Sequence, residues 1–268
     1  MMHRPALAAL LLGVIAAGPA VAGEGRDLCP DRPGIGTPAC TLDPGRVQIE
    51  AGIGDWTMDR QPDSRTDTIS AGDFLLRVGL GEHIEAQLGW TAFGHVRTRD
   101  RATGAVDKAS GVGDVTLAVR RNLARPDGGG FAVAVQPYAT LPAGGHAIGA
   151  GDWGAGLLVP LSYDLSDRFQ IALTPEIDAA VDEDRDGRHL SYGTAAGLGV
   201  AMSDAVSATI EMAAYRDRDP AGHSTQLLAG LSFALQSGED MQFDAGANAG
   251  LNHATPDIEL YLGITRRF

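Results

Sequence analysis

The acidic run between residues 182 and 187 comes nearest to a ligand-binding motif in this sequence. Asp182, Asp184 and Asp186 alternate and Gly187 follows them, as in the first half of a calcium loop, where carboxylates converge on the ion. The twelfth position of such a loop is Gly193 here, not the glutamate that completes the ligand set. The run therefore indicates a solvated acidic loop, with weak calcium binding as the alternative.

Two other motifs are candidates for nucleotide binding or catalysis. Residues 149–154 fit the pattern G-x-G-x-x-G, but alternating residues and a proline follow them, whereas a pyrophosphate site needs a helix there. His223 and Ser224 are neighbours, so their side chains would point to opposite sides of a strand, and no third orienting residue accompanies them. We therefore expect no enzymatic activity and no cofactor, with a hydrolase that uses such residues as the alternative.

The two cysteines, Cys29 and Cys40, lie close together in a segment rich in proline and glycine. A redox centre would favour the spacing Cys-x-x-Cys, and a metal site would need further ligands nearby. Both patterns are absent from this segment. We predict one disulfide, which implies an oxidising compartment.

The beginning of the chain resembles an export signal. His3 and Arg4 precede an apolar run, and Ala20-Val21-Ala22 forms a small-x-small cleavage site. The run is shorter than the ~20 residues that a membrane-spanning helix requires. We predict a signal peptide over residues 1–22.

Charge and composition narrow the classes of function. The chain has 268 residues and a net charge of -13, with 21 Lys and Arg against 34 Asp and Glu. This balance disfavours binding to nucleic acid, which is itself a polyanion. The 36 glycines and the 6% aromatic content also disfavour a helical core.

From Arg46 onward, stretches of about ten residues alternate with period two, which is the period of a β-strand. In one stretch Ile84, Ala86 and Leu88 share a face, while Glu85 and Gln87 share the other. Twelve stretches follow this pattern, with ten or fourteen strands as the alternatives.

The charged residues of these stretches lie on the face opposite to the apolar one. In a barrel with an apolar exterior they would line the lumen. The residues predicted to line it are Glu50, Asp73, Arg77, Glu85, Asp114, Arg120, Glu176, Glu211 and Asp244. Acids outnumber bases in this set, so the charges either pair into a network that seals the lumen or leave a path that tolerates cations.

The connections between the stretches differ in length by parity, which is typical of an outer-membrane barrel and not of a sandwich. The short connections are 80–82, 165–167 and 203–205, and the long ones are 58–65, 95–111, 144–151, 182–189 and 216–223. We predict an all-β protein: a transmembrane antiparallel up-and-down β-barrel of about twelve strands over residues 46–268. The disulfide-bonded segment 23–45 would stay in the periplasm or plug the lumen.

The chain ends in Phe268 after an alternating stretch. A terminal aromatic residue on the last strand is what outer-membrane barrels present to the barrel assembly machinery. Arg266 departs from this pattern, because that position is usually apolar or aromatic. Trp56, Trp90 and Trp153 are candidates for an aromatic belt at the lipid interface.

Several short motifs resemble those of a known family. They are Thr37-Pro38, Pro44-Gly45, Val78-Gly79-Leu80-Gly81 with Ile84-Glu85, Gly111-Val112-Gly113-Asp114-Val115, and Leu141-Pro142. Together they resemble the outer-membrane transporter family of the phenol-degradation meta-pathway type. This resemblance implies a barrel that passes small, often aromatic or otherwise hydrophobic compounds.

The sequence thus predicts an outer-membrane channel of a bacterial cell for passive passage of small hydrophobic or aromatic solutes. Its expected partners are outer-membrane lipid, a small-molecule solute and, through Phe268, the barrel assembly machinery. Nucleic acid is not expected as a partner. The alternative functions are an outer-membrane hydrolase that uses rim residues, and a structural or adhesive barrel that acts through its loops.

Overall fold

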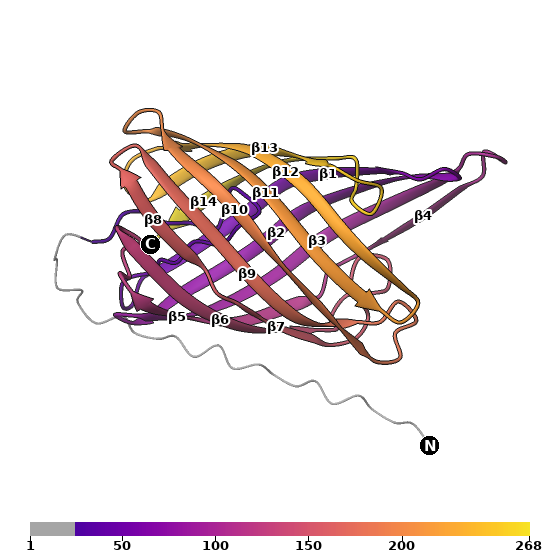
Figure 1. The fold of residues 1–268 in the computed structure, drawn as a ribbon, viewed down its shortest axis with the longest axis horizontal. Coiled ribbons are helices and arrows are strands. Elements are labelled where there is room, and N and C mark those ends of the chain that lie inside the picture. Colours follow the sequence, from indigo (N-terminus) through magenta and orange to yellow (C-terminus); the bar gives the residue numbers. More distant parts are fainter. Residues whose placement is uncertain (1–24) are drawn as a thin grey trace, which may run out of the picture.

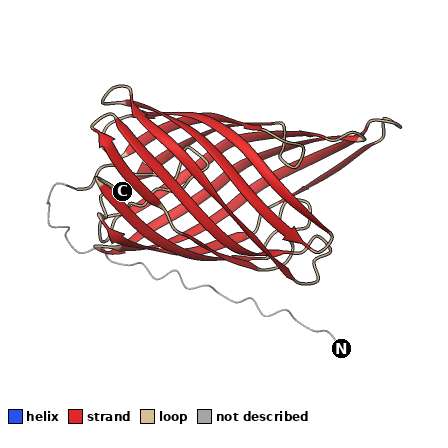
Figure 2. Ribbon diagram, in the orientation of Figure 1, coloured by secondary structure: helices blue, strands red, loops and turns tan. Residues whose placement is uncertain are grey.

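The chain forms a closed all-β barrel (Figures 1 and 2). The structure, a computed structural model, describes residues 25–268; the predicted signal peptide lies outside these residues. The strands are β1 (Val47–Arg60), β2 (Ser64–Gly81), β3 (Ile84–Asp100), β4 (Val106–Gly111), β5 (Val115–Ala124), β6 (Phe131–Leu141), β7 (Gly154–Leu158), β8 (Leu161–Ser166), β9 (Phe169–Val181), β10 (Arg188–Ala201), β11 (Val206–Asp219), β12 (Gly222–Gln236), β13 (Met241–Gly250) and β14 (Ile258–Arg267). Within residues 25–268, no helix has the length and apolar character to cross a membrane.

These elements make twelve barrel strands, which confirms the predicted fold class and strand number. Strands β4 and β5 pair in turn with β3 and act as one strand interrupted at residues 112–114. Strands β7 and β8 likewise pair with β6 and β9 on either side of an interruption at Val159 and Pro160. Pro160 has no N–H to donate to the ladder, so an interruption at this position is expected.

The barrel closes between its first and last strands. β1 pairs antiparallel with β14, from Gln48 opposite Arg267 to Met58 opposite Ile258. Phe268 extends this ladder, since its N–H donates to the carbonyl of Val47 at 2.8 Å. Together with the pairing of β9 and β10 this leaves the barrel without an open edge.

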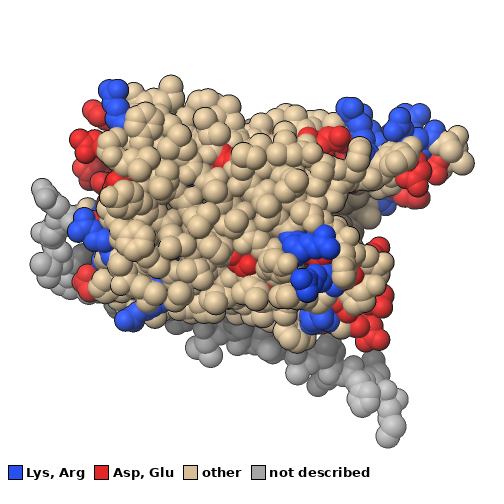
Figure 3. Space-filling view, in the orientation of Figure 1, with Lys and Arg blue, Asp and Glu red and all other residues tan. Residues whose placement is uncertain are grey.

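The alternation seen in the sequence becomes an exterior of apolar side chains and an interior of polar ones. Ile49 and Phe74 are each 40% exposed, whereas Glu50 and Arg77 are fully buried. Figure 3 shows the charged side chains gathered mainly at the two ends, with a broad uncharged band between them. Large apolar side chains remain exposed in this way when the surrounding solvent is lipid.

Several predicted long loops are instead strand pairs that continue beyond the uncharged band. β3 runs to Asp100 and β4 resumes at Val106, so most of the predicted loop 95–111 is paired strand. The predicted loop 216–223 is also wrong, because β11 ends at Asp219 and β12 begins at Gly222. Outside lipid both faces of a strand tolerate polar residues, so hydrophobic alternation is lost while the backbone pairing continues. In Figure 1 the extensions of β2, β3 and β4 project furthest from the barrel.

Candidate functional site

Residues 25–46, which we call the N-terminal segment, lie inside the end of the barrel near the C-terminus (Figure 1). The segment forms hydrogen bonds with side chains of strands on opposite sides of the wall. These wall residues are Glu50, Arg77, Glu85, Arg120, Thr174, Glu211 and Gln242. The segment therefore crosses the lumen.

The predicted disulfide joins Cys29 and Cys40, which are 11 positions apart. It closes a loop whose two ends both face arginines of the wall. The carbonyl of Cys29 accepts a hydrogen bond from Arg77 at 2.7 Å, and that of Cys40 accepts one from Arg120 at 3.2 Å. The loop closed by the disulfide thus places two backbone carbonyls within hydrogen-bond distance of two inward-facing arginines.

Between this loop and strands β1, β2, β3 and β5 lies a charge cluster formed by Asp31, Glu50, Arg77, Glu85 and Arg120. Arg77 Nε lies 2.8 Å from Glu85 Oε1, and Arg77 Nη1 lies 3.2 Å from Glu50 Oε1. Asp31 joins both cations: its Oδ1 lies 2.9 Å from Arg77 Nη1, and its Oδ2 accepts a hydrogen bond from Arg120. The four wall side chains are fully buried. Loss of Arg77 or Arg120 from the cluster leaves buried carboxylates uncompensated, which is far more destabilising than loss of an exposed pair.

The backbone of the N-terminal segment caps three wall carboxylates. Glu50 and Glu211 each accept two N–H groups from consecutive residues, at 2.7 to 3.0 Å, and Glu85 accepts one at 2.8 Å. The donors are, in this order, Asp31 with Arg32, Ile35 with Gly36, and Leu42. Hydrogen bonds to an ionised carboxylate are stronger than neutral ones. These three inward acids therefore have specific partners in the segment.

Arg32 adds a cation to the lumen from the segment itself. Its Nη2 lies 3.2 Å from Asp244, and its backbone carbonyl accepts a hydrogen bond from Gln242 at 2.9 Å. On the same segment, the N–H of Thr37 donates to Thr174 at 3.0 Å. The segment is thus anchored at β9 and β13 as well as at the charge cluster.

The first described residues of the segment are held by Arg267 of β14. This guanidinium donates to the carbonyl of Arg26 at 2.6 Å and to Asp240 at 2.7 Å. The bond from Arg267 and its positive charge hold the pKa of Asp240 below its ordinary value. The carboxylate of Asp240, in the turn after β12, therefore remains ionised and keeps Arg267 in place at neutral pH.

Six of the nine residues predicted to line the lumen contact the segment: Glu50, Arg77, Glu85, Arg120, Glu211 and Asp244. The other three do not. Asp73 accepts a hydrogen bond from Thr91, Glu176 is half-buried beside Asp178, and Asp114 accepts the backbone N–H groups of Gly144 and Ala150. Asp114 thus holds the loop that follows β6.

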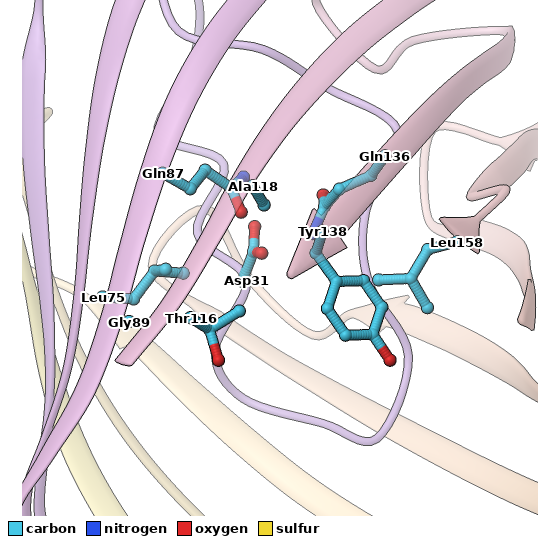
Figure 4. A pocket seen from close by; sticks show the side chains of 9 residues that line it. All are labelled: Asp31, Leu75, Gln87, Gly89, Thr116, Ala118, Gln136, Tyr138 and Leu158. Carbon is cyan, nitrogen blue, oxygen red and sulfur yellow. The ribbon is translucent and has the colours of Figure 1, made fainter. Parts of the chain in front are cut away.

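Asp31 lines a cavity of about 200 Å³ together with side chains of β2, β3, β5, β6 and β7 (Figure 4). The side chains of Leu75, Ala118 and Leu158 supply its apolar lining, and Tyr138 presents its ring to it. Its other polar lining residues, besides Asp31, are Gln87, Thr116 and Gln136. The hydroxyl of Tyr138 donates to Asp178, so the ring has a fixed position. We call this space the lumen pocket.

The three aspartates of the predicted calcium loop are not brought together. Asp182 instead faces His189 and Asp219, while Asp184 and Asp186 are exposed on the turn. His223, the candidate catalytic residue, is exposed at the start of β12.

The first of three similar solved structures supports the fold and nothing beyond the fold. The transport unit of the autotransporter AIDA-I from Escherichia coli has 9% sequence identity and a TM-score of 0.50, over 83% of this chain and 90% of that one. The CymD monoaromatic hydrocarbon channel has 8% identity and a TM-score of 0.43, over 84% and 88%. The β-domain of the Bordetella autotransporter BrkA has 11% identity and a TM-score of 0.47, over 84% and 99%.

No curated protein matches the chain in sequence. A family model does, and it covers residues 30–268, that is, the whole barrel and most of the N-terminal segment. The resemblance seen in the short motifs is thereby confirmed. The chain belongs to the family described as the putative MetA-pathway of phenol degradation.

Proposed function

We propose that this protein is a passive channel of the bacterial outer membrane for small hydrophobic or aromatic solutes, with the N-terminal segment as its plug. The proposal is supported by the closed barrel with an apolar exterior and by the family to which the chain belongs. It includes no cofactor and no chemical step.

The observation that carries the proposal is the lumen pocket, which Asp31 of the plug helps to line. Its volume of about 200 Å³ suits a single-ring solute, since cavities of ~150 Å³ hold benzene. Leu75, Leu158 and the Tyr138 ring offer apolar contact, and Gln87 and Gln136 offer hydrogen bonds to a hydroxyl or carboxylate substituent. A solute with one ring and one polar group fits this lining.

Passage along the lumen requires movement of the plug, because the plug crosses the lumen and its Asp31 lines the pocket. Most contacts of the plug with the wall are hydrogen bonds and ion pairs. Each hydrogen bond to a charged group contributes about 1.5–3 kcal/mol, so the plug opens rarely, but none of these contacts belongs to the ladders between the strands. A plug held in this way is able to open without unfolding the barrel.

A pair of neighbouring variants tests the pocket. Leu158→Trp places a large ring in the pocket, whereas Leu157→Trp adds the same ring to the exterior, where Leu157 is 36% exposed. With phenol as the probe, titration calorimetry of the purified protein in detergent should show binding to the wild type and to Leu157→Trp. Binding should be at least tenfold weaker in Leu158→Trp. Equal binding by the two variants would place the solute outside this pocket.

The rival functions have separate outcomes. A structural or adhesive barrel binds no small solute and passes no ions in a planar bilayer. A rim hydrolase cleaves ester, phospholipid or peptide substrates and loses this activity in His223→Ala. Either result would replace the proposed channel.

A further inference from the structure

The ends of β9, β10 and β11 bring together a histidine and three aspartates at the rim opposite the chain termini. His189 lies near the start of β10, Asp182 follows β9, and Asp217 and Asp219 end β11. His189 Nδ1 lies 2.9 Å from Asp182 Oδ1 and 3.3 Å from Asp219 Oδ2. These side chains are only 6%, 11% and 12% exposed, respectively.

The charges of this cluster do not balance. Within residues 25–268, no Lys or Arg lies within ion-pair distance of Asp182, Asp217 or Asp219. Even a doubly protonated His189 contributes a single positive charge against three carboxylates. Largely buried carboxylates require compensation, which a cation supplies.

The imidazole of His189 has carboxylate oxygens near both of its nitrogens. Nε2 is buried and has no aligned hydrogen-bond partner, although Asp217 Oδ1 lies 3.0 Å away. Nδ1, by contrast, faces the two carboxylate oxygens and has an aligned contact with Asp182. The ring thus directs one nitrogen at a point shared with two carboxylates.

Backbone contacts hold the two carboxylates in place. Asp219 accepts the N–H groups of Glu183 and Ala221, each at 2.7 Å. Gly187 has a φ of +131° and packs against the carboxylate of Asp182, so that a Cβ at this position would overlap it. The carboxylates are therefore oriented before any ligand arrives.

We propose that Asp182, His189 and Asp219 bind a divalent transition-metal ion of the zinc type. A tetrahedral zinc site with bonds of 2.0–2.2 Å separates its ligand atoms by about 3.3 Å, close to the distances from Nδ1 to the two carboxylates. Asp217 Oδ1 lies 3.0 Å from Nε2, on the side of the ring where a carboxylate supports a metal-bound histidine. The nitrogen ligand favours zinc over calcium, which prefers oxygen ligands only.

The bound ion would cross-link the ends of three strands at the rim. This role is independent of solute passage through the lumen, and its test does not depend on channel activity.

The test is a zinc titration of the untagged, folded full-length barrel in detergent, followed by calorimetry, with Co²⁺ absorption as a second readout of the ligand set. We expect one ion per barrel and an affinity at least 100-fold lower in His189→Ala and in Asp219→Asn. Asp217→Asn should lose 10- to 100-fold, as for other carboxylates that support a metal-bound histidine. Heat-modifiable mobility in gels verifies that each variant is folded.

Asp184→Asn and Asp186→Asn are the matched controls, because these exposed aspartates belong to the same turn. They should bind zinc as the wild type does. Absence of zinc binding by the wild type, unchanged affinity in folded His189→Ala, or loss of binding in either control would overturn the proposal. Binding of calcium but not zinc would overturn it as well.

Discussion

Asp31 is the one acid that the N-terminal segment contributes to the charge cluster, so its replacement separates plug docking from barrel stability. Without Asp31, the wall retains two acids, Glu50 and Glu85, and two bases, Arg77 and Arg120. These four charges balance and stay in mutual contact. Asp31→Asn should therefore weaken the docking of the plug and leave the barrel intact.

The magnitude follows from the contacts that are lost. Asp31 accepts one charge-assisted hydrogen bond from Arg120 and lies 2.9 Å from Arg77. A hydrogen bond to a charged group contributes about 1.5–3 kcal/mol. With the second ion pair included, and a weak bond retained by asparagine, we expect a loss of about 3 kcal/mol. Since about 1.4 kcal/mol corresponds to a tenfold change in an equilibrium constant, the undocked population should rise about 100-fold.

Hydrogen–deuterium exchange of the protein in detergent measures this population directly. The N–H groups of Ile35, Gly36 and Leu42 are bonded to wall carboxylates, so they exchange when the plug undocks. Their exchange should accelerate about 100-fold in Asp31→Asn and remain at the wild-type rate in Asp27→Asn, whose side chain is exposed. Exchange within threefold of the wild type in Asp31→Asn, or equal acceleration in the control, would refute the assigned role of Asp31.

Three further outcomes are expected. Replacing both Cys29 and Cys40 by serine removes up to about 3 kcal/mol of the stabilisation that the disulfide gives to its loop. Proteolysis of the segment should therefore accelerate, while heat-modifiable mobility of the barrel stays unchanged. Unaltered proteolysis would contradict the docked geometry. Gly79→Ala places a Cβ against the backbone where the segment enters the barrel, so it should accelerate the same exchange; Gly54→Ala, which has open space around its Cβ, should not. The N–H and carbonyl of Phe268 both pair with β1. Deleting Phe268 should therefore reduce the amount of folded barrel in the outer membrane, as measured by heat-modifiable mobility. Undiminished assembly would show that the terminal residue is dispensable.

The barrel itself was predictable, because lipid outside and charge inside impose a strict alternation on every strand. The pairs Ile49 with Glu50 and Phe74 with Arg77 already show which face is which. Strand ends were predicted less well, since polar hairpins beyond the lipid, such as the end of β3, carry no such pattern.

The interior was predictable in its composition but not in its pairing. An excess of inward acids over Arg77 and Arg120 indicates that donors must come from elsewhere. The sequence does not show that these donors are backbone N–H groups of the segment, because backbone groups have no sequence signature. The contacts of Asp31 and Arg32 with the wall are not predictable for a related reason, since both residues lie outside every alternating stretch.

The cluster of Asp182, His189, Asp217 and Asp219 at the rim was predictable only in part. The spacing of Asp182, Asp184 and Asp186 indicates the turn that contributes to the cluster, but local spacing does not identify partners across strands. His189 and Asp219 reach Asp182 through the antiparallel pairing of β10 with its two neighbours. This long-range register carries no local signal.

Single-channel conductance in a planar bilayer tests most directly whether the N-terminal segment closes the lumen. The wild-type protein should show a low, mostly closed conductance with rare openings. A chain that lacks residues 25–45 and is verified as folded by heat-modifiable mobility should show steady open steps. Equal conductance of the two proteins, whether both open or both closed, would contradict the segment's role as a plug.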